Sequence, residues 1–260
     1  MKLIFTVFAF VLLHLTYAQY AYFPEAGIIH YEKTVHVKNF MKRQMSLSKD
    51  DGFDRTYVEQ LMGKAPDTYI FKNKLLFQGD ESRYEPVKEE LTGVMRNLIW
   101  FGFDYSTVYY QNQHNGAFKS VAEYVGSNIL TVDSLLQVKW KITDEYRTIA
   151  GYNCRRANGV VLDSVFVVAF YTDDIPLSSG PGAFHGLPGM ILGLVVPEQH
   201  YNIYATKVDF TQPQISADLG KKKDKPMTRE ELKVFLRDRM RVGDWSTEQQ
   251  LNFLLTNLYL

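Results

Sequence analysis

The sequence predicts a mainly β protein with minor α-structure: an antiparallel, strongly curved sheet or half-barrel, with short helices at the C-terminus and near residues 40–62. Tyr and Phe, 17 residues of each, favour half-buried pleated surfaces. Apolar and polar residues alternate in many short runs bounded by Gly, Asn and Asp, which is the pattern of strands joined by turns. Leucines recur at helical spacing near the end of the chain.

Length and charge limit the possible functions. A chain of 260 residues suits one large β domain, or one domain with a small appendage. The formal net charge is zero, so no global basic field attracts nucleic acid, and we expect no nucleic-acid partner. We divide the chain into a signal peptide at 1–18, an antiparallel β domain at 19–212, and a charged linker with a helical segment at 213–260.

The first residues have the pattern of an export signal. Lys2 gives a positive start, residues 3–15 are almost wholly apolar, and Ala18 is a small residue at the expected cleavage point. The apolar stretch is short for a bilayer span, although an uncleaved anchor or a buried first helix is the alternative. We predict cleavage after Ala18, a periplasmic or secreted location, and no transmembrane segment in the mature chain.

The strands are predicted from alternation. Residues 28–37 place Ile29 and Tyr31 on one face and His30 and His36 on the other. The two histidines are roughly 20 Å apart along a strand, too far to share a metal ion. The same pattern predicts strands at 68–71, 74–78, 83–85, 107–111, 118–125, 138–142, 149–157, 160–171, 190–196 and 201–208.

Turn residues set the expected breaks between these strands. Asn73 is predicted to separate two short strands, and Asn158-Gly159 is a strong hairpin-turn signal. Residues 128–136 are predicted to be a link. In the strand that follows, Trp140 and Ile142 are predicted to point inward.

The C-terminal part is predicted to be helical. Residues 220–225 form a charged linker, which we interpret as a solvated loop in preference to a binding patch. Thr228 and Ser246 begin capping-box patterns that predict helices at 230–240 and 247–258. The second helix carries an apolar stripe of Leu251, Leu254, Leu255 and Leu258.

Residues 178–192 contain four glycines and two prolines and lead directly into an apolar run. Proline restricts φ and glycine permits positive φ, so this loop has a specified shape. We favour an architectural role in which Phe184 and Leu187 pack inward. The alternative is a lid over a hydrophobic groove. No Gly-Lys-Ser/Thr follows, so the loop is not a phosphate loop.

Few residues suggest catalysis. Cys154 is the one cysteine, and a pair with His185 is conceivable if their strands adjoin. A buried Cys154 and a surface His185 are the simpler expectation, because a reactive thiol needs an electropositive, partly exposed setting. Asp173-Asp174 could bind a cation but fits a solvated turn better. We predict no metal and no cofactor.

Residues 138–208 resemble the GLPGLI family of exported proteins from Bacteroidetes, for which no activity is established. The resemblance rests on Trp140, Ile149-Ala150-Gly151-Tyr152-Asn153-Cys154-Arg155-Arg156-Ala157, Ile175-Pro176 to Gly180-Pro181, and the naming loop Gly186-Leu187-Pro188-Gly189-Met190-Ile191. Met190 replaces the usual Leu, and Phe170-Tyr171-Thr172 lacks the tryptophan that members often have before Tyr-Thr. The resemblance implies localisation and fold. The tyrosine-rich strands are also remotely similar to half-barrel lipoprotein carriers of the envelope.

Two alternative hypotheses for the function follow. The first is a non-enzymatic exported module that binds an apolar ligand or an envelope protein, with candidate groove and lid residues Trp140, Tyr152, Phe184, His185 and Leu187. The alternative is a thiol- or histidine-dependent hydrolase that uses Cys154 or His185.

Overall fold

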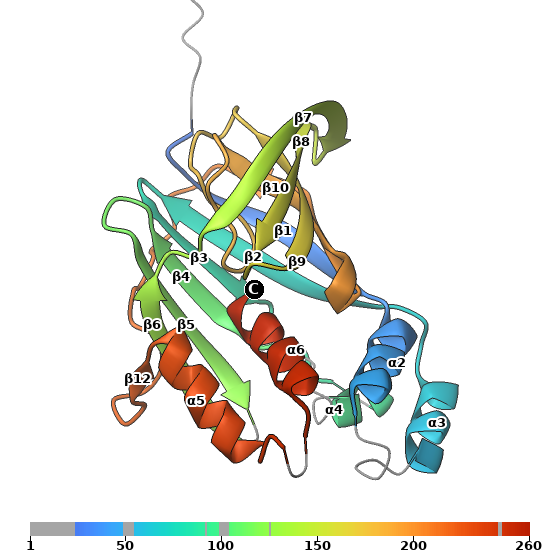
Figure 1. The fold of residues 1–260 in the computed structure, drawn as a ribbon. Helices are drawn as coiled ribbons and strands as arrows, with labels where there is room; N and C mark the ends of the chain where they lie inside the picture. The colour runs from blue at the N-terminus through green and yellow to red at the C-terminus, as the bar shows by residue number, and fades with distance from the viewer. Residues whose placement is uncertain (1–23, 49–54, 92, 99–103, 125, 244–245) are drawn as a thin grey trace, which may run out of the picture.

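A computed structural model describes residues 24–48, 55–91, 93–98, 104–124, 126–243 and 246–260. The predicted signal peptide lies outside these residues. In the described part, strands form one twelve-stranded sheet in the order β12-β6-β5-β4-β3-β2-β1-β11-β10-β9-β8-β7 (Figure 1). All neighbours are antiparallel except β12, which runs parallel to β6. The mainly β prediction is confirmed, and the sheet is mixed where a wholly antiparallel one was expected.

The first strand lies in the middle of the sheet. β1 pairs with β2 on one side and with β11 on the other. The strands are β1 (Ala26–Val35), β2 (Tyr69–Gln78), β3 (Glu81–Pro86), β4 (Val108–Asn112), β5 (Ala117–Tyr124), β6 (Ser127–Ser134), β7 (Val138–Ile149), β8 (Tyr152–Val161), β9 (Val165–Thr172), β10 (Met190–Val196), β11 (Tyr201–Asp209) and β12 (Pro226–Met227).

Only residues 135–137 join β6 to β7, although these strands lie near opposite ends of the strand order. Consecutive Cα atoms are 3.80 Å apart, so the last residue of β6 and the first of β7 are within about 15 Å of each other. Leu135 and Leu136 in this connection are buried. The connection therefore brings the two parts of the sheet together at one point.

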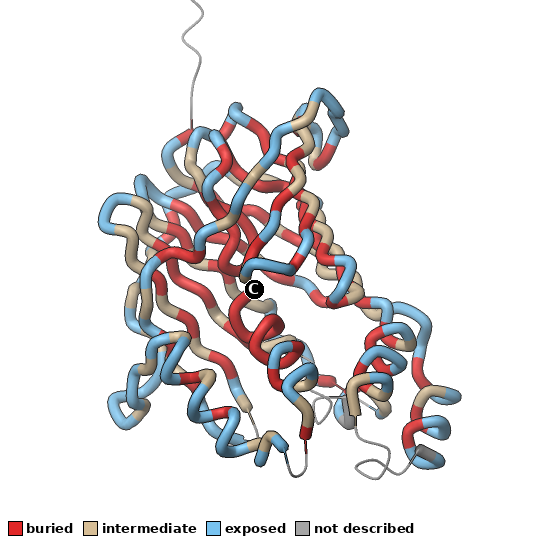
Figure 2. The backbone as a smooth tube through the Cα atoms, in the orientation of Figure 1, coloured by how far each residue is buried: buried red, intermediate tan, exposed pale blue. Residues whose placement is uncertain are grey.

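In Figure 1 the C-terminal helix lies against the face of the sheet, and the other helices gather around the lower end of the sheet. Phe253 of the C-terminal helix contacts the ring of Phe40 at 5.4 Å between centroids. Figure 2 shows that buried residues follow the strands and this helix. The helices are α2 (Val37–Leu47), α3 (Arg55–Lys64), α4 (Val94–Leu98), α5 (Arg229–Arg239) and α6 (Glu248–Tyr259), with a 3₁₀ turn η2 (Pro197–Gln199).

Local signals predicted both C-terminal helices. Thr228 and Glu231 form the expected capping box of α5. For α6 the cap is Thr247 with Gln250, one residue later than predicted from Ser246. The leucine stripe of α6 is buried, as expected of core packing.

The predicted turn at Asn158-Gly159 is wrong, because β8 continues through both residues to Val161. Gly159 has another purpose: a Cβ there would lie 2.6 Å from the Trp140 ring, which packs across the strand pair. The turn lies at Leu162 and Asp163, whose φ values are 50° and 63°. The predicted strand at 160–171 is therefore two strands.

Four smaller predictions also fail. Asn73 is no turn but a buried residue within β2, where it pairs with Tyr31 of β1. Ile142 is 40% exposed, because the register of β7 shifts between Ile142 and Tyr146. Residues 128–136, expected as a link, lie largely in β6. The strand predicted to reach residue 37 ends at Val35, where α2 follows closely.

Candidate functional site

The loop between β9 and β10 is buried against the sheet. Phe184 is fully buried, and Ser179 and Ala183 are also inaccessible. The Ser179 and Ser82 hydroxyls lie 2.7 Å apart, and Gln111 Nε2 donates to the Gly182 carbonyl at 3.0 Å. These bonds attach the loop to β3 and β4. The sequence predicted a loop that packs on the sheet and is not helical, and the structure has such a loop.

Glycine allows the closest approach within this loop. Gly182 has a φ of 66°, and a Cβ at this position would lie 1.9 Å from the carbonyl oxygen of Leu260. An L side chain there would meet backbone as well as conformational strain. The glycine therefore lets the loop lie directly against the end of the described chain.

Trp140 and His185, two of the predicted groove residues, are in contact. The Trp140 indole Nε1–H donates to the His185 carbonyl at 2.8 Å. His185 Nε2 is 2.8 Å from the Leu136 carbonyl, which can only accept, so Nε2 carries the proton. Both bonds join the loop to the β6–β7 connection and to β7. Their function here is to hold backbone segments together.

The other predicted groove residues lie elsewhere or deep in the core. Leu187 is 2% exposed and, like Phe184, packs in the main hydrophobic core. Tyr152 begins β8, whereas Trp140 pairs with Gly159 seven residues further along that strand. At 3.3 Å per residue, the two positions are roughly 23 Å apart. The five candidates therefore do not converge on one groove.

Cys154 is fully buried, and burial raises the pKa of its thiol to about 12. Cys154 is five residues from Gly159 along β8, a distance of roughly 17 Å. Gly159 pairs with Trp140, whose indole contacts His185, so Cys154 is far from His185. Burial lowers the pKa of His185. The structure thus provides neither an accessible thiolate nor a thiol–imidazole pair. Among the residues described, no three His, Cys, Asp or Glu side chains are placed to hold a metal ion.

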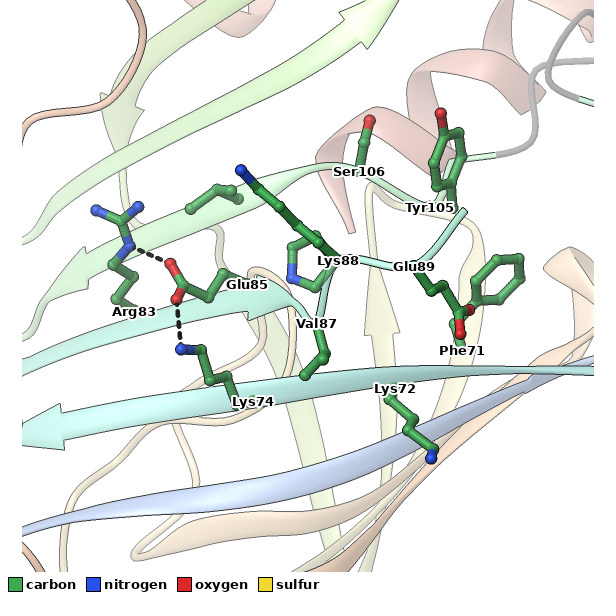
Figure 3. Close-up of a pocket in the computed structure, with 12 residues that line it drawn as sticks. Phe71, Lys72, Lys74, Arg83, Glu85, Val87, Lys88, Glu89, Tyr105 and Ser106 are labelled. Atoms are coloured by element: carbon green, nitrogen blue, oxygen red, sulfur yellow. Dashed lines mark hydrogen bonds and ion pairs between the residues drawn. The ribbon is translucent and has the colours of Figure 1, made fainter. Parts of the chain in front are cut away.

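An open cavity of about 750 Å³ lies beside β2, β3 and the start of β4, and we call it the β2–β4 cavity (Figure 3). Its apolar walls come from aromatic, proline and valine side chains, and six charged residues complete it. Its lining residues are Phe71, Lys72, Lys74, Arg83, Glu85, Pro86, Val87, Lys88, Glu89, Tyr105, Ser106 and Val108.

The charges of the β2–β4 cavity are organised around Glu85. Lys74 Nζ lies 3.0 Å from Glu85 Oε1, and Arg83 Nε donates to Oε2 at 2.7 Å. Burial alone would raise the pKa of Glu85, but the bonds from Lys74 and Arg83 outweigh it and hold that pKa below its usual value. Glu85 is therefore ionised at neutral pH and already shared between two cations.

A small polar cavity of about 20 Å³ lies next to the larger one, and Phe71 and Tyr105 line both. Lys33 Nζ lies there, 4.5 Å from the centre of the Tyr201 ring. Burial lowers the pKa of Lys33. The buried Tyr84 hydroxyl has no hydrogen-bond partner among the described residues. The volume suits about one water molecule, which could serve both groups.

Sequence reasoning predicted the strands around the β2–β4 cavity but not the cavity itself. Lys72 and Lys74 alternate with buried residues in β2, and Arg83 and Glu85 alternate with buried residues in β3. This alternation places the charges on one face. The pairing of Lys74 with Glu85 depends on the β2–β3 register, which the sequence does not state.

Fold and loop together define the class: a mainly β protein with a buried glycine–proline segment. Within it, residues 159–193 match the family described as "Protein of unknown function (Porph_ging)". No curated protein matches the chain. Among the described residues no helix has both the length and the apolar character needed to cross a bilayer.

Two solved structures are similar over most of this chain. "Structure of PNGF-II in P21 space group" is 17% identical over 82% of the chain, with a TM-score of 0.49. "Structure of PNGF-II in C2 space group" is 14% identical over 89% of the chain, with a TM-score of 0.46. The chain spans 32% of the length of each of these proteins.

Proposed function

We propose that this chain is an exported, non-enzymatic ligand-binding protein of the GLPGLI type, and that an apolar ligand occupies the β2–β4 cavity. The cavity carries the proposal. Its volume of about 750 Å³ falls within the ~300–1,000 Å³ of small-molecule sites. Val87, Tyr105 and Val108, which are exposed or half-buried, supply the apolar contacts that such sites use; Phe71 also lines the cavity but is only 3% exposed. A ligand that covers them replaces water on aromatic and aliphatic surface, which is favourable.

The glycine–proline loop has an architectural role in this proposal. Phe184 and Leu187 are committed to the core, and the Trp140 and His185 bonds join backbone segments. A lid that opened would break these contacts and expose buried apolar surface. We therefore assign ligand binding to the β2–β4 cavity in place of the five predicted groove and lid residues.

The hydrolase alternative has little chemical support. A thiol with a pKa near 12 is almost wholly protonated at neutral pH, and the thiol, unlike the thiolate, is a poor nucleophile. The His185 imidazole is engaged with the Leu136 carbonyl. That bond leaves Nδ1 as the basic nitrogen, but the imidazole is 9% exposed and the thiol is fully buried, so both have little access to a substrate or to water.

Export and strong sheet curvature are further parts of the proposal. The signal pattern at residues 1–18 supports export, and the match at 159–193, which includes the loop, supports the GLPGLI type. The three-residue connection between β6 and β7 supports a half-barrel, because a flat sheet would hold these strands about ten strand spacings apart. Mass spectrometry of the exported chain should show Gln19 as its first residue; an intact Met1 would contradict cleavage.

Ligand binding can be tested with alkyl probes and a pair of matched variants. Val87 lines the cavity and Val234 lies on α5, and both are exposed, so Val→Trp should be tolerated at either position. Isothermal titration calorimetry with decanol and decanoate should show one-to-one binding. Val87→Trp should abolish that binding by placing an indole in the space that the ligand occupies, and Val234→Trp should preserve it. If neither probe binds, or if Val87→Trp has no effect, the proposal is wrong.

A further inference from the structure

We infer that the ligand of the β2–β4 cavity is an anionic amphiphile, with its apolar body near Phe71 and Tyr105 and its acidic headgroup near Lys88 and Arg83. This inference rests on the proposed function and adds the chemical class of the ligand. It depends on the charge balance of the cavity and on the way its charges and aromatic rings are separated.

The charge balance favours an anion. Four cationic side chains line the cavity against two carboxylates, which leaves two positive charges in excess. Glu85 is bonded to both Lys74 and Arg83, so its charge is offset within the protein. Lys88 has no ion pair within the described parts of the chain. An acidic headgroup would provide the partner that Lys88 lacks, and charge-assisted hydrogen bonds are about twice as strong as neutral ones.

The cavity has two chemically different ends. In Figure 3, Lys74 and Arg83 converge on Glu85, and the Lys88 side chain extends toward the same side. Phe71 and Tyr105 lie together at the other end, with Glu89 beside them. The Glu89 carboxylate repels an anion from the aromatic end, so it favours one orientation of the ligand.

The charged side chains of the cavity differ in exposure, so salt should weaken their effects on ligand binding to different degrees. Lys88 and Glu89 are exposed, so salt screens them, but Glu85 and Arg83 are largely covered and are screened less. The arginine is also held from behind, because Arg83 Nη1 donates to the Ser216 carbonyl at 3.0 Å. A fixed guanidinium loses little side-chain entropy when a ligand binds.

Three probes with the same chain and different headgroups test the ligand class: decanoate, decanol and decylamine, titrated below their critical micelle concentrations. Decanoate should bind about tenfold more tightly than decanol, which corresponds to one charge-assisted contact. Decylamine should bind most weakly. The advantage of decanoate over decanol should shrink as salt is raised.

Charge reversal provides the matched control. Lys88→Glu should weaken decanoate binding by about tenfold or more and strengthen decylamine binding. Lys222→Glu makes the same change of net charge on the 220–225 linker, outside the residues that line the cavity, and should leave the order of the probes unchanged. A long-range effect of net charge would appear in both variants, and a headgroup contact only in Lys88→Glu.

The outcomes separate this inference from the proposed function. Equal binding of all three probes, abolished by Val87→Trp, would refute the anionic class and leave the apolar site in place. Absence of binding by any probe would refute both. Decanoate binding that survives Val87→Trp would place the ligand elsewhere and would also refute both. Preference for decanoate, lost in Lys88→Glu and in Val87→Trp, supports the inference.

Discussion

Gly182→Ala, compared with Gly116→Ala, tests whether the loop lies against the end of the described chain. The two glycines have nearly the same conformation, with φ values of 66° and 69°. The strain of placing Ala in this region, about 1–2 kcal/mol, is therefore shared, and so is the effect of Ala on the unfolded chain. A Cβ on Gly116 meets nothing within 4 Å, whereas on Gly182 it would lie 1.9 Å from the Leu260 carbonyl oxygen.

The difference between the two variants follows from that contact. Ordinary contacts begin near 3.4 Å, so the two backbones must separate by about 1.5 Å. This movement disturbs the buried bond from Gln111 to the Gly182 carbonyl, worth about 1–3 kcal/mol, and adds overpacking of about 1–3 kcal/mol. Gly182→Ala should thus cost about 3 kcal/mol more than Gly116→Ala in urea unfolding. Equal costs within about 0.5 kcal/mol would refute the close approach.

Three further perturbations test the loop and its surroundings. Iodoacetamide should not label Cys154 in the folded protein at pH 8, because the thiol is buried and its pKa is raised to about 12. Denaturation should make Cys154 reactive. Rapid labelling of the native protein would instead support a hydrolase that uses the Cys154 thiol. Burial lowers the pKa of His185, so the unfolded chain binds a proton at this residue more readily than the folded chain does. The free energy of unfolding should therefore decline as pH falls below about 6.5, and His185→Gln should reduce this decline. An unchanged pH profile in His185→Gln would show that His185 is not the residue responsible. Gly159→Ala should cost about 1–3 kcal/mol by overpacking, because a Cβ would lie 2.6 Å from the Trp140 ring and 2.8 Å from Val167 Cγ2. In a Trp140→Leu background the cost should fall by the Trp140 share and keep the Val167 share; fully additive costs in a double-mutant cycle would show that Gly159 and Trp140 do not pack together.

Elements determined by local chemistry could be predicted from the sequence. The strand at 190–196 has the bounds that its apolar run and the following Pro197 indicated. The capping box of α5 is formed by Thr228 and Glu231, which are three residues apart. It could be predicted because the side chain of each bonds to the backbone of the other. The inward packing of Phe184 was also expected, because a loop of glycine and proline has few conformations.

Features that depend on distant contacts could not be predicted. Asn158-Gly159 has the composition of a turn, but the glycine is needed for the ring of Trp140, a residue of the neighbouring strand. Asn73 has the composition of a turn as well, yet its backbone completes the central pairing with β1. The β2–β4 cavity arises where β3 and the start of β4 meet β2. Its volume and charge balance depend on all of these segments together, so no single stretch of the sequence predicts them.

The central position of β1 has a consequence for how the protein reaches this structure. The His30 and Asp209 side chains meet at 3.2 Å although they are 179 residues apart in the chain. Closing so long a loop costs entropy before the pairing repays it, which slows folding. Until β11 arrives, one edge of β1 has no partner and can pair with another molecule. Docking of β11 should therefore be a late, slow event in refolding, and the period of greatest aggregation should end when it occurs.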